Sequence, residues 1–463
     1  MAAMPSARCR PAVHEGESDD SEGILRRQSQ RESAARTYAR SLPVVPVRAR
    51  GMTIEGADGR RYLDCLSGAG ALALGHNHPV VLEAIRGVLD SGAPLHVLDL
   101  ATPVKDAFTT ALFETLPPRL ARHGRIQFCG PAGTDAVEAA LKLVRTATGR
   151  DGLLAFSGGY HGMTAAALAA TGDTAVRGAA GTADARVTRL PYPYDYRCPF
   201  GVGGEGGAEL SARLTESLLD DPKGGIQPPA GMLLEPVQGE GGVIPAPDTW
   251  LRRMRELTAA RGIPLIADEV QTGVGRTGTF WAVEHSGIVP DVMVLSKAIG
   301  GSLPLAVIVY REELDCWQPG AHAGTFRGNQ LAMAAGTATL AYVKRNGLAE
   351  RAALLGDRML ARLRGLAAEH PCVGDVRGRG LMLGVELVDP EAATGPGAVP
   401  PTAPRLAAAV RRAALDRGLI VELGGRDSSV IRLLPPLTIT EEQSEAVLDR
   451  LADALAAVTA VRA

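Results

Sequence analysis

Short apolar runs alternate with helical patterns through the middle of the chain. The runs contain few polar residues, as expected for strands that are covered on both faces of a sheet. They lie at residues 125–129, 152–156, 232–234, 264–267, 292–295 and 305–310. Between them, apolar side chains recur at helical spacing in residues 134–148, which Gly149 would end, and in residues 249–261. This alternation predicts an α/β domain with a mostly parallel sheet flanked by helices.

Both ends of the chain follow a different pattern. Short strand patterns with the turn signal Asp58-Gly59 occupy residues 45–64, and a helical pattern follows at residues 79–89. The C-terminal part combines long helical patterns with strand patterns, at residues 348–369, 381–387, 403–418 and 431–434. These patterns predict a second, smaller α+β domain built from both chain ends.

The chain is therefore expected to divide into four segments. A disordered tail would cover residues 1–30, because its segment Glu15-Gly-Glu-Ser-Asp-Asp-Ser-Glu22 is acidic and small. The small domain would take residues 31–95 and 341–463, and the large domain residues 96–340. We expect surface loops at the Gly- and Pro-rich residues 201–207 and 394–404.

Composition narrows the classes of partner. The 463 residues carry a formal net charge of −2, so a large basic face for nucleic acid is not expected. No apolar run approaches the roughly 18 residues of a membrane span, and the N-terminus has no apolar stretch typical of a secretory signal. The six cysteines are scattered without a Cys-x-x-Cys pair. We therefore expect free thiols in a reducing cytoplasm, with neither a metal site nor a disulfide framework.

Polar residues follow three of the predicted strands, where ligands bind in an open α/β sheet. The turn Gly130-Pro-Ala-Gly-Thr-Asp135 precedes a helix, and its backbone N–H groups near Gly133 and Thr134 are suited to bind a phosphate. Asp268 ends an apolar run, and Lys297 lies two residues after another. A buried Asp268 suits a protonated pyridine nitrogen, and a desolvated Lys297 suits a nucleophilic amine.

Each of these motifs also has an ordinary structural interpretation. In that interpretation, the turn is a tight turn in which Asp135 caps the helix that follows it. Asp268 forms a buried ion pair, and Lys297 extends its ammonium group to solvent. Their occurrence in this order on one α/β scaffold favours the functional interpretation.

These residues resemble the class III, or ω-type, aminotransferases of pyridoxal phosphate (PLP) fold type I. The resemblance extends from about residue 30 to the C-terminus. The residues that it implies for binding PLP are Gly133, Thr134, Tyr160, Asp268, Val270, Gln271, Lys297 and Thr325. Lys297 would hold the cofactor covalently and carry catalysis together with Asp268, which would pair with the pyridine nitrogen.

The other PLP contacts follow from the same resemblance. Val270 and Tyr160 would cover the two faces of the ring, and Gln271 would bond its hydroxyl. Gly133 and Thr134 would bind the phosphate. Thr325, in Gly324-Thr-Phe-Arg-Gly328, would reach the phosphate of a neighbouring subunit, which implies a homodimer with active sites at the subunit interface.

Two segments bear on the substrate. Glu235-Pro-Val-Gln-Gly-Glu-Gly-Gly242 and Val430-Ile-Arg-Leu-Leu-Pro-Pro436 resemble family segments that recognise substrate carboxylates. They assign Arg432 as the carboxylate-binding residue and Glu240 as its gate, while a structural ion pair of Arg432 remains the alternative. We leave His161 and His76 outside the mechanism, because histidines in such loops are more often structural.

A narrower set of motifs resembles the 2,4-diaminobutyrate transaminases. It comprises Leu66-Ser-Gly-Ala-Gly70, Gly75-His-Asn-His-Pro79, Phe128 to Ala140, Pro191-Tyr-Pro-Tyr194 and Gly324 to Gln330. The implied reaction converts L-aspartate 4-semialdehyde and L-glutamate into L-2,4-diaminobutyrate and 2-oxoglutarate, reversibly. The alternatives are an aminotransferase for ornithine, acetylornithine, 4-aminobutyrate or a polyamine, a glutamate-semialdehyde-type aminomutase, and a non-catalytic PLP-binding protein.

Overall fold

A seven-stranded sheet forms the centre of the large domain in the computed structural model, which describes residues 21–178, 186–393 and 398–460. In spatial order its strands are β4 (Gly124–Phe128), β12 (Val307–Arg311), β11 (Val292–Leu295), β10 (Leu265–Asp268), β7 (Gly231–Leu234), β5 (Leu153–Phe156) and β6 (Val187–Leu190). Strand β12 runs antiparallel to both of its neighbours, and the other pairings are parallel. The predicted mostly parallel sheet is confirmed.

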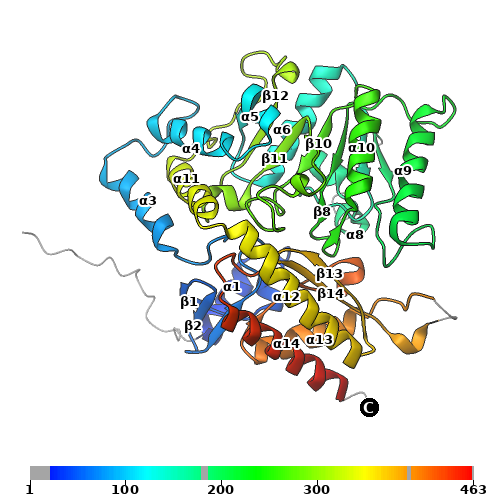
Figure 1. Ribbon diagram of the computed structural model, residues 1–463. Helices are drawn as coiled ribbons and strands as arrows, with labels where there is room; N and C mark the ends of the chain where they lie inside the picture. Colours follow the sequence, from blue (N-terminus) through cyan, green and yellow to red (C-terminus); the bar gives the residue numbers. More distant parts are fainter. Residues whose placement is uncertain (1–20, 179–185, 394–397, 461–463) are drawn as a thin grey trace, which may run out of the picture.

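Helices cover this sheet in the way that the apolar spacing predicts. Helix α6 (Gly133–Thr148) buries Val137, Ala140, Leu141 and Val144 and ends at Gly149, whose φ of 66° is left-handed. It packs against β11 and β12, whereas α10 (Asp248–Ala260) packs against β10 and α9 (Gly204–Asp220) (Figure 1). Other helices around the sheet are α3 (Pro79–Asp90), α4 (Pro103–Phe113), α5 (Pro118–His123), α7 (Ala165–Ala170), α8 (Thr174–Gly178) and α11 (Gln330–Arg345).

Two four-stranded sheets form the smaller part of the molecule. One joins β1 (Pro46–Arg50), β2 (Thr53–Gly56), β3 (Arg61–Asp64) and β15 (Leu419–Ile420), and the other joins β13 (Val373–Arg379), β14 (Met382–Leu387), β17 (Val430–Leu433) and β16 (Glu422–Gly424). Because β15 pairs with β3, this part contains both chain ends, as predicted. The boundaries at residues 95 and 340 stay a prediction.

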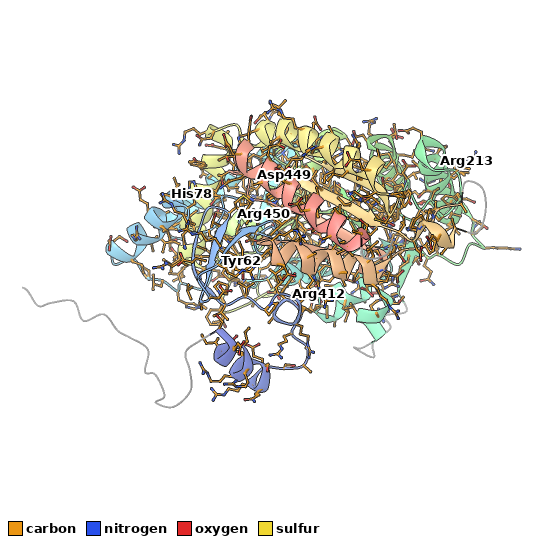
Figure 2. All side chains as sticks on the ribbon, turned by 90° about the horizontal axis from the view of Figure 1, so that it is seen from below. Tyr62, His78, Arg213, Arg412, Asp449 and Arg450 are labelled. Carbon is orange, nitrogen blue, oxygen red and sulfur yellow. The ribbon has the colours of Figure 1, made fainter. Side chains whose placement is uncertain are left out.

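Three helices cover the small domain on one side. They are α12 (Leu348–Glu369), α13 (Pro404–Asp416) and α14 (Glu441–Ala460). Helices α13 and α14 lie side by side, with Arg412 on the first and Asp449 and Arg450 on the second (Figure 2). Arg450 donates a hydrogen bond of 2.7 Å to the carbonyl of Gly418, just before β15, and so ties α14 to the end of α13.

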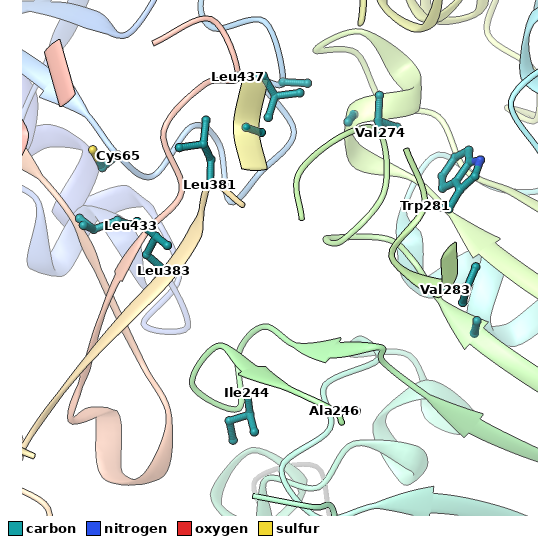
Figure 3. Packing of buried hydrophobic residues seen from close by; sticks show 14 of the residues in the cluster. Cys65, Ile244, Ala246, Val274, Trp281, Val283, Leu381, Leu383, Leu433 and Leu437 are labelled. Carbon is teal, nitrogen blue, oxygen red and sulfur yellow. The ribbon is translucent and has the colours of Figure 1, made fainter. Parts of the chain in front are cut away.

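One apolar core connects the two parts. Its buried side chains include Cys65, Leu383 and Leu433 of the small domain and Val274 and Trp281 of the large domain (Figure 3). Continuous apolar packing of this kind resists relative movement, because close-packed interiors transmit strain. The core therefore fixes the loops that approach the sheet edge from both sides.

Two sequence predictions are wrong. Residues 21–30, assigned to a disordered tail, lie within helix α1 (Ser21–Arg31), where Glu22 and Arg31 complement the helix dipole. The predicted loop at residues 201–207 already contains the start of α9. Gly207 lies within that helix, where a larger residue would clash because a Cβ would lie 2.7 Å from the Cys198 sulfur.

The rest of the tail, residues 1–20, and residues 394–397 of the second predicted loop lie outside the described residues. In the part of the chain that is described, no helix is long and apolar enough to cross a membrane.

Candidate active site

A cavity of about 260 Å³ opens at the carboxyl edge of the large sheet. Segments that follow β4, β5, β7, β10 and β11 meet there, because parallel strands present their carboxyl ends at one edge. The lining residues are Ala132, Gly133, Thr134, Tyr160, His161, Gly162, Met163, Glu235, Glu240, Asp268, Val270, Gln271 and Lys297. All of the predicted site residues except Thr325 and Arg432 line this cavity, and Arg432 contacts it through Glu240 and Gln271.

Lys297 occupies a strained turn directly after β11. Its φ of 50° lies in the left-handed region, which costs a non-glycine residue about 1–3 kcal/mol and is found mainly at functional sites. Burial lowers the pKa of its ammonium group, Glu240 opposes this shift and Arg432 adds to it. Within the described residues its amine makes no hydrogen bond or ion pair. Lys297 is thus available as a nucleophile.

Asp268 is held by two hydrogen bonds inside the wall of the cavity. Its Oδ1 accepts from the backbone N–H of Val270 at 3.1 Å, and its Oδ2 lies 2.7 Å from Nδ1 of His161. Both side chains are buried. Burial lowers the pKa of His161, but the hydrogen bond and the charge of Asp268 outweigh burial, so the pKa is raised. The pair therefore fixes the orientation of the Asp268 carboxylate at the cavity.

The opposite end of the cavity is formed by the start of α6. A Cβ on Gly133 would lie 3.1 Å from Cγ1 of Val270, so only glycine leaves this surface open. The Thr134 hydroxyl bonds to that of Thr164 at 2.6 Å, and Asp135 accepts from the backbone of Ala132. The helix start is both capped, as the structural interpretation requires, and open to a ligand.

Glu235 fixes the segment that carries Tyr160. Its carboxylate accepts hydrogen bonds from the backbone N–H groups of Tyr160 and Gly239, each at 2.9 Å. Burial raises the pKa of Glu235 to about 7, although His161 opposes this shift. Glu235 thus joins the loops that follow β5 and β7.

Arg432 is completely buried and contacts two carboxylates. Its Nη2 lies 2.8 Å from Oε2 of Glu240 and also contacts Oε2 of Glu422. The amide of Gln271 lies between Glu240 and Arg432, 3.4 Å from each. Burial lowers the pKa of Arg432, but the two carboxylates outweigh it and raise the pKa. The structure thus brings together the predicted Glu240 and Arg432, and it adds Glu422, which sequence reasoning missed.

Thr325 lies away from the cavity on an exposed segment. Its backbone carbonyl accepts a hydrogen bond from His96 at 2.9 Å, and the side chain of the next residue, Phe326, is 69% exposed. A role for Thr325 in the pocket of the same chain is therefore not supported, and its predicted role toward a second subunit stays a prediction.

A second hollow of about 350 Å³ adjoins the first, because both are lined by Tyr160 and Glu240. Arg426 also lines it, with its guanidinium 5.8 Å from the centroid of the Tyr194 ring. Burial lowers the pKa of Arg426, and the Tyr194 and Glu386 charges oppose this shift. Within the described part of the chain, Arg426 forms no ion pair. No sequence motif indicates this cation, which lies six residues before Arg432.

Comparison with known proteins identifies the family. The model of the class III aminotransferases matches residues 34–455. A diaminobutyrate–2-oxoglutarate aminotransferase of Rhizobium meliloti is 56% identical over 95% of this chain and 92% of its own. One from Haemophilus influenzae is 47% identical over 92% and 93%. A PLP-bound amine transaminase from an uncultivated Pseudomonas species has a TM-score of 0.81 and 29% identity, covering 92% of this chain and 98% of its own.

Proposed function

The chain belongs to the class III aminotransferases, and from that premise we propose that it interconverts L-aspartate 4-semialdehyde plus L-glutamate with L-2,4-diaminobutyrate plus 2-oxoglutarate. The names of its relatives support this substrate pair. The observation that carries the proposal is the buried Arg432, whose partner Glu240 lines the same cavity as Lys297. Such a pair can serve two amino donors that differ in charge beside the reacting amine.

The cavity fits PLP, the cofactor of this family. Lys297 would hold it covalently, Asp268 would keep its pyridine nitrogen protonated, and the open α6 start at Gly133 and Thr134 would bind its phosphate. Val270 and Tyr160 would cover the ring, and Gln271 would bond the ring hydroxyl. When bound, PLP supplies an electron sink that makes a C–H bond beside the reacting nitrogen acidic.

Proton transfer would then be the task of Lys297. With a substrate amine bound, Nζ of Lys297 would be free within the cavity. Burial lowers the pKa of its ammonium group, which favours the neutral amine that can act as a base. Nζ would accept the proton from the substrate carbon that bears the nitrogen and deliver it to the cofactor carbon bonded to the same nitrogen.

Glu240 and Arg432 would distinguish the two donors. Glutamate reacts beside its α-carboxylate, which Arg432 would bind by charge-assisted hydrogen bonds after Glu240 moves away. Diaminobutyrate reacts at its far amine, where no carboxylate is adjacent. Glu240 would then stay on Arg432, because a buried guanidinium without a partner is costly.

Both donors share a second feature. Measured from the reacting carbon, the distal carboxylate of glutamate and the α-carboxylate of diaminobutyrate stand at the same position along the chain. One cation can therefore bind both. Arg426, in the adjoining hollow and without a carboxylate partner among the described residues, is our candidate.

The substrate proposal is tested with purified holoenzyme, 2-oxoglutarate and a panel of donors. The panel contains 2,4-diaminobutyrate, ornithine, acetylornithine, 4-aminobutyrate and putrescine, and products are identified by mass spectrometry. We expect diaminobutyrate to give glutamate and aspartate 4-semialdehyde with the highest kcat/KM. A higher value with another donor would replace the proposed substrate without affecting the reaction class.

We further propose a homodimer in which Thr325 of one subunit reaches the phosphate site of the other. The exposed position of Thr325, outside the cavity of its own chain, supports this arrangement. Light scattering after gel filtration should give twice the chain mass. Full activity of a monomer would contradict it.

A further inference from the structure

Glu422 gives Arg432 a second carboxylate partner, for which the gating mechanism has no use. It stands on β16 directly opposite Arg432 on β17, in antiparallel register. Its Oε2 contacts the same Nη2 that bonds to Glu240. A single cation thus lies between two carboxylates.

The two carboxylates differ in how tightly their surroundings hold them. Glu240 lies between β8 (Val237–Gln238) and β9 (Ile244–Pro245), is flanked by glycines, and has a side chain that is 30% exposed. The side chain of Glu422 is 11% exposed, belongs to a strand, and lies close to the hydroxyl of Tyr38. Glu240 can therefore leave Arg432, while Glu422 stays.

The charge balance of this cluster depends on which carboxylates are present. With Glu240 in place, one guanidinium faces two carboxylates. Burial raises the pKa of Glu422, and Glu240 adds to this shift while Arg432 and Lys297 oppose it. A positively charged group on the substrate, close to Glu422, would stabilise the ionised form of this carboxylate.

Diaminobutyrate carries such a group. Its α-ammonium remains charged while the far amine reacts, whereas 4-aminobutyrate is the same molecule without that ammonium. We propose that Glu422 is a specificity-determining residue that binds the non-reacting ammonium of a diamino acid and so selects it over the matching monoamino acid. This inference rests on the proposed function, since it assumes that diaminobutyrate reacts at its far amine.

Glu422→Gln tests this role. The amide keeps the size of the side chain but removes the charge. In single-turnover measurements on the holoenzyme, we expect the preference for diaminobutyrate over 4-aminobutyrate to fall about 10- to 100-fold, as is usual for one charged hydrogen bond. The inhibition constant of 4-aminobutyrate against glutamate is measured as well, so that weak turnover cannot hide its binding. That constant should change less than threefold.

Three comparisons make the result decisive. Glu422→Asp keeps the charge and should retain most of the preference. Glu216→Gln removes a carboxylate on α9 that contacts Arg253 on α10 and Arg261 just after it, and should leave the preference unchanged. An unchanged preference in Glu422→Gln, or equal losses for both donors, would overturn the inference and leave Glu422 as a support for Arg432. A wild-type enzyme without diaminobutyrate activity would instead refute the proposed function.

Discussion

His161 and Asp268 form a buried hydrogen-bonded pair, with Nδ1 of the histidine 2.7 Å from Oδ2 of the aspartate. The histidine follows β5 and the aspartate ends β10, so the pair joins two strands at the edge where the cavity opens. A hydrogen bond between two buried side chains fixes their relative orientation. His161 is therefore a positioning residue that holds the Asp268 carboxylate toward the cofactor site.

Replacement of His161 should lower kcat more than cofactor content. We expect His161→Phe to reduce kcat about 10- to 100-fold, since a hydrogen bond to a charged group contributes roughly 1.5–3 kcal/mol. His161→Gln keeps a donor and should recover part of the loss. The pH dependence of the cofactor absorbance is the deciding measurement. An identical pH profile in the wild type and in both variants would mean that His161 only packs against its neighbours.

Lys297→Ala should abolish transamination while the protein remains folded. The variant loses both the covalent link to PLP and the base that moves the proton, so no measurable turnover should remain. In the wild type, borohydride reduction followed by peptide mapping should find the cofactor on the peptide that contains Lys297. Attachment to any other lysine would contradict the assignment.

Asp268 and Lys297 could be predicted from the sequence, because each follows an apolar strand and parallel strands align their carboxyl ends at one edge. Glu422 could not be found in this way. Its meeting with Arg432 depends on the register of the β16–β17 hairpin, which a search for family motifs does not address. A two-residue turn at Gly424 and Gly425 would pair Glu422 with Asp427, whereas the strands are joined by residues 425–429 and Gly424 pairs with Val430. His161 was left outside the predicted mechanism as a structural histidine, and its pairing with Asp268, 107 residues away in the chain, could not be predicted.

Glu269, beside Asp268, should make stability depend on pH. Burial raises the pKa of its carboxyl to about 7, although hydrogen bonds from Thr272 and Val283 oppose this shift. The unfolded chain releases this proton near pH 4.5, so the folded state is favoured below that pH and loses stability as pH rises to about 7. The loss is at most about 3 kcal/mol.

Glu269→Gln should therefore reduce the decline of the thermal midpoint between pH 5 and pH 7. Glu235 has a similarly raised pKa, so part of the decline should remain. Differential scanning calorimetry of both proteins at three pH values provides the comparison. A variant whose midpoint declines as steeply as that of the wild type would show that Glu269 is already ionised when folded.

Arg426→Gln should lower the activity with both donors to the same extent, because each donor presents a carboxylate at the same distance from the reacting carbon. We expect kcat/KM to fall about 10- to 100-fold for glutamate and for diaminobutyrate. The donor 1,3-diaminopropane, which is diaminobutyrate without its carboxylate, should be unaffected. The exposed Arg412 on α13 offers a control through Arg412→Gln. A loss confined to one of the two amino acids would assign the shared carboxylate to another cation.

Replacing Glu240 and replacing Arg432 should have opposite effects on the two half-reactions. In Glu240→Ala, Arg432 keeps only Glu422 when diaminobutyrate is bound, and it is freely available to an α-carboxylate. The diaminobutyrate half-reaction should weaken, while the glutamate half-reaction is spared or strengthened. Arg432→Ala should mainly damage the half-reactions of glutamate and 2-oxoglutarate. The ratio of the two half-reactions should shift by about 1–3 kcal/mol in each variant.

Single-turnover rates show whether Glu240 and Arg432 act as a gate or only support the structure of the cavity, because they report each half-reaction without the other. Gln271 bonds to both residues, so Glu240→Gln is a useful companion that keeps the side-chain length while removing the charge. If the gate works through charge, Glu240→Gln should follow Glu240→Ala in direction. If it works through shape, the amide should behave like the wild type. Equal slowing of both half-reactions in all variants would mean that selection between the donors is made elsewhere in the cavity.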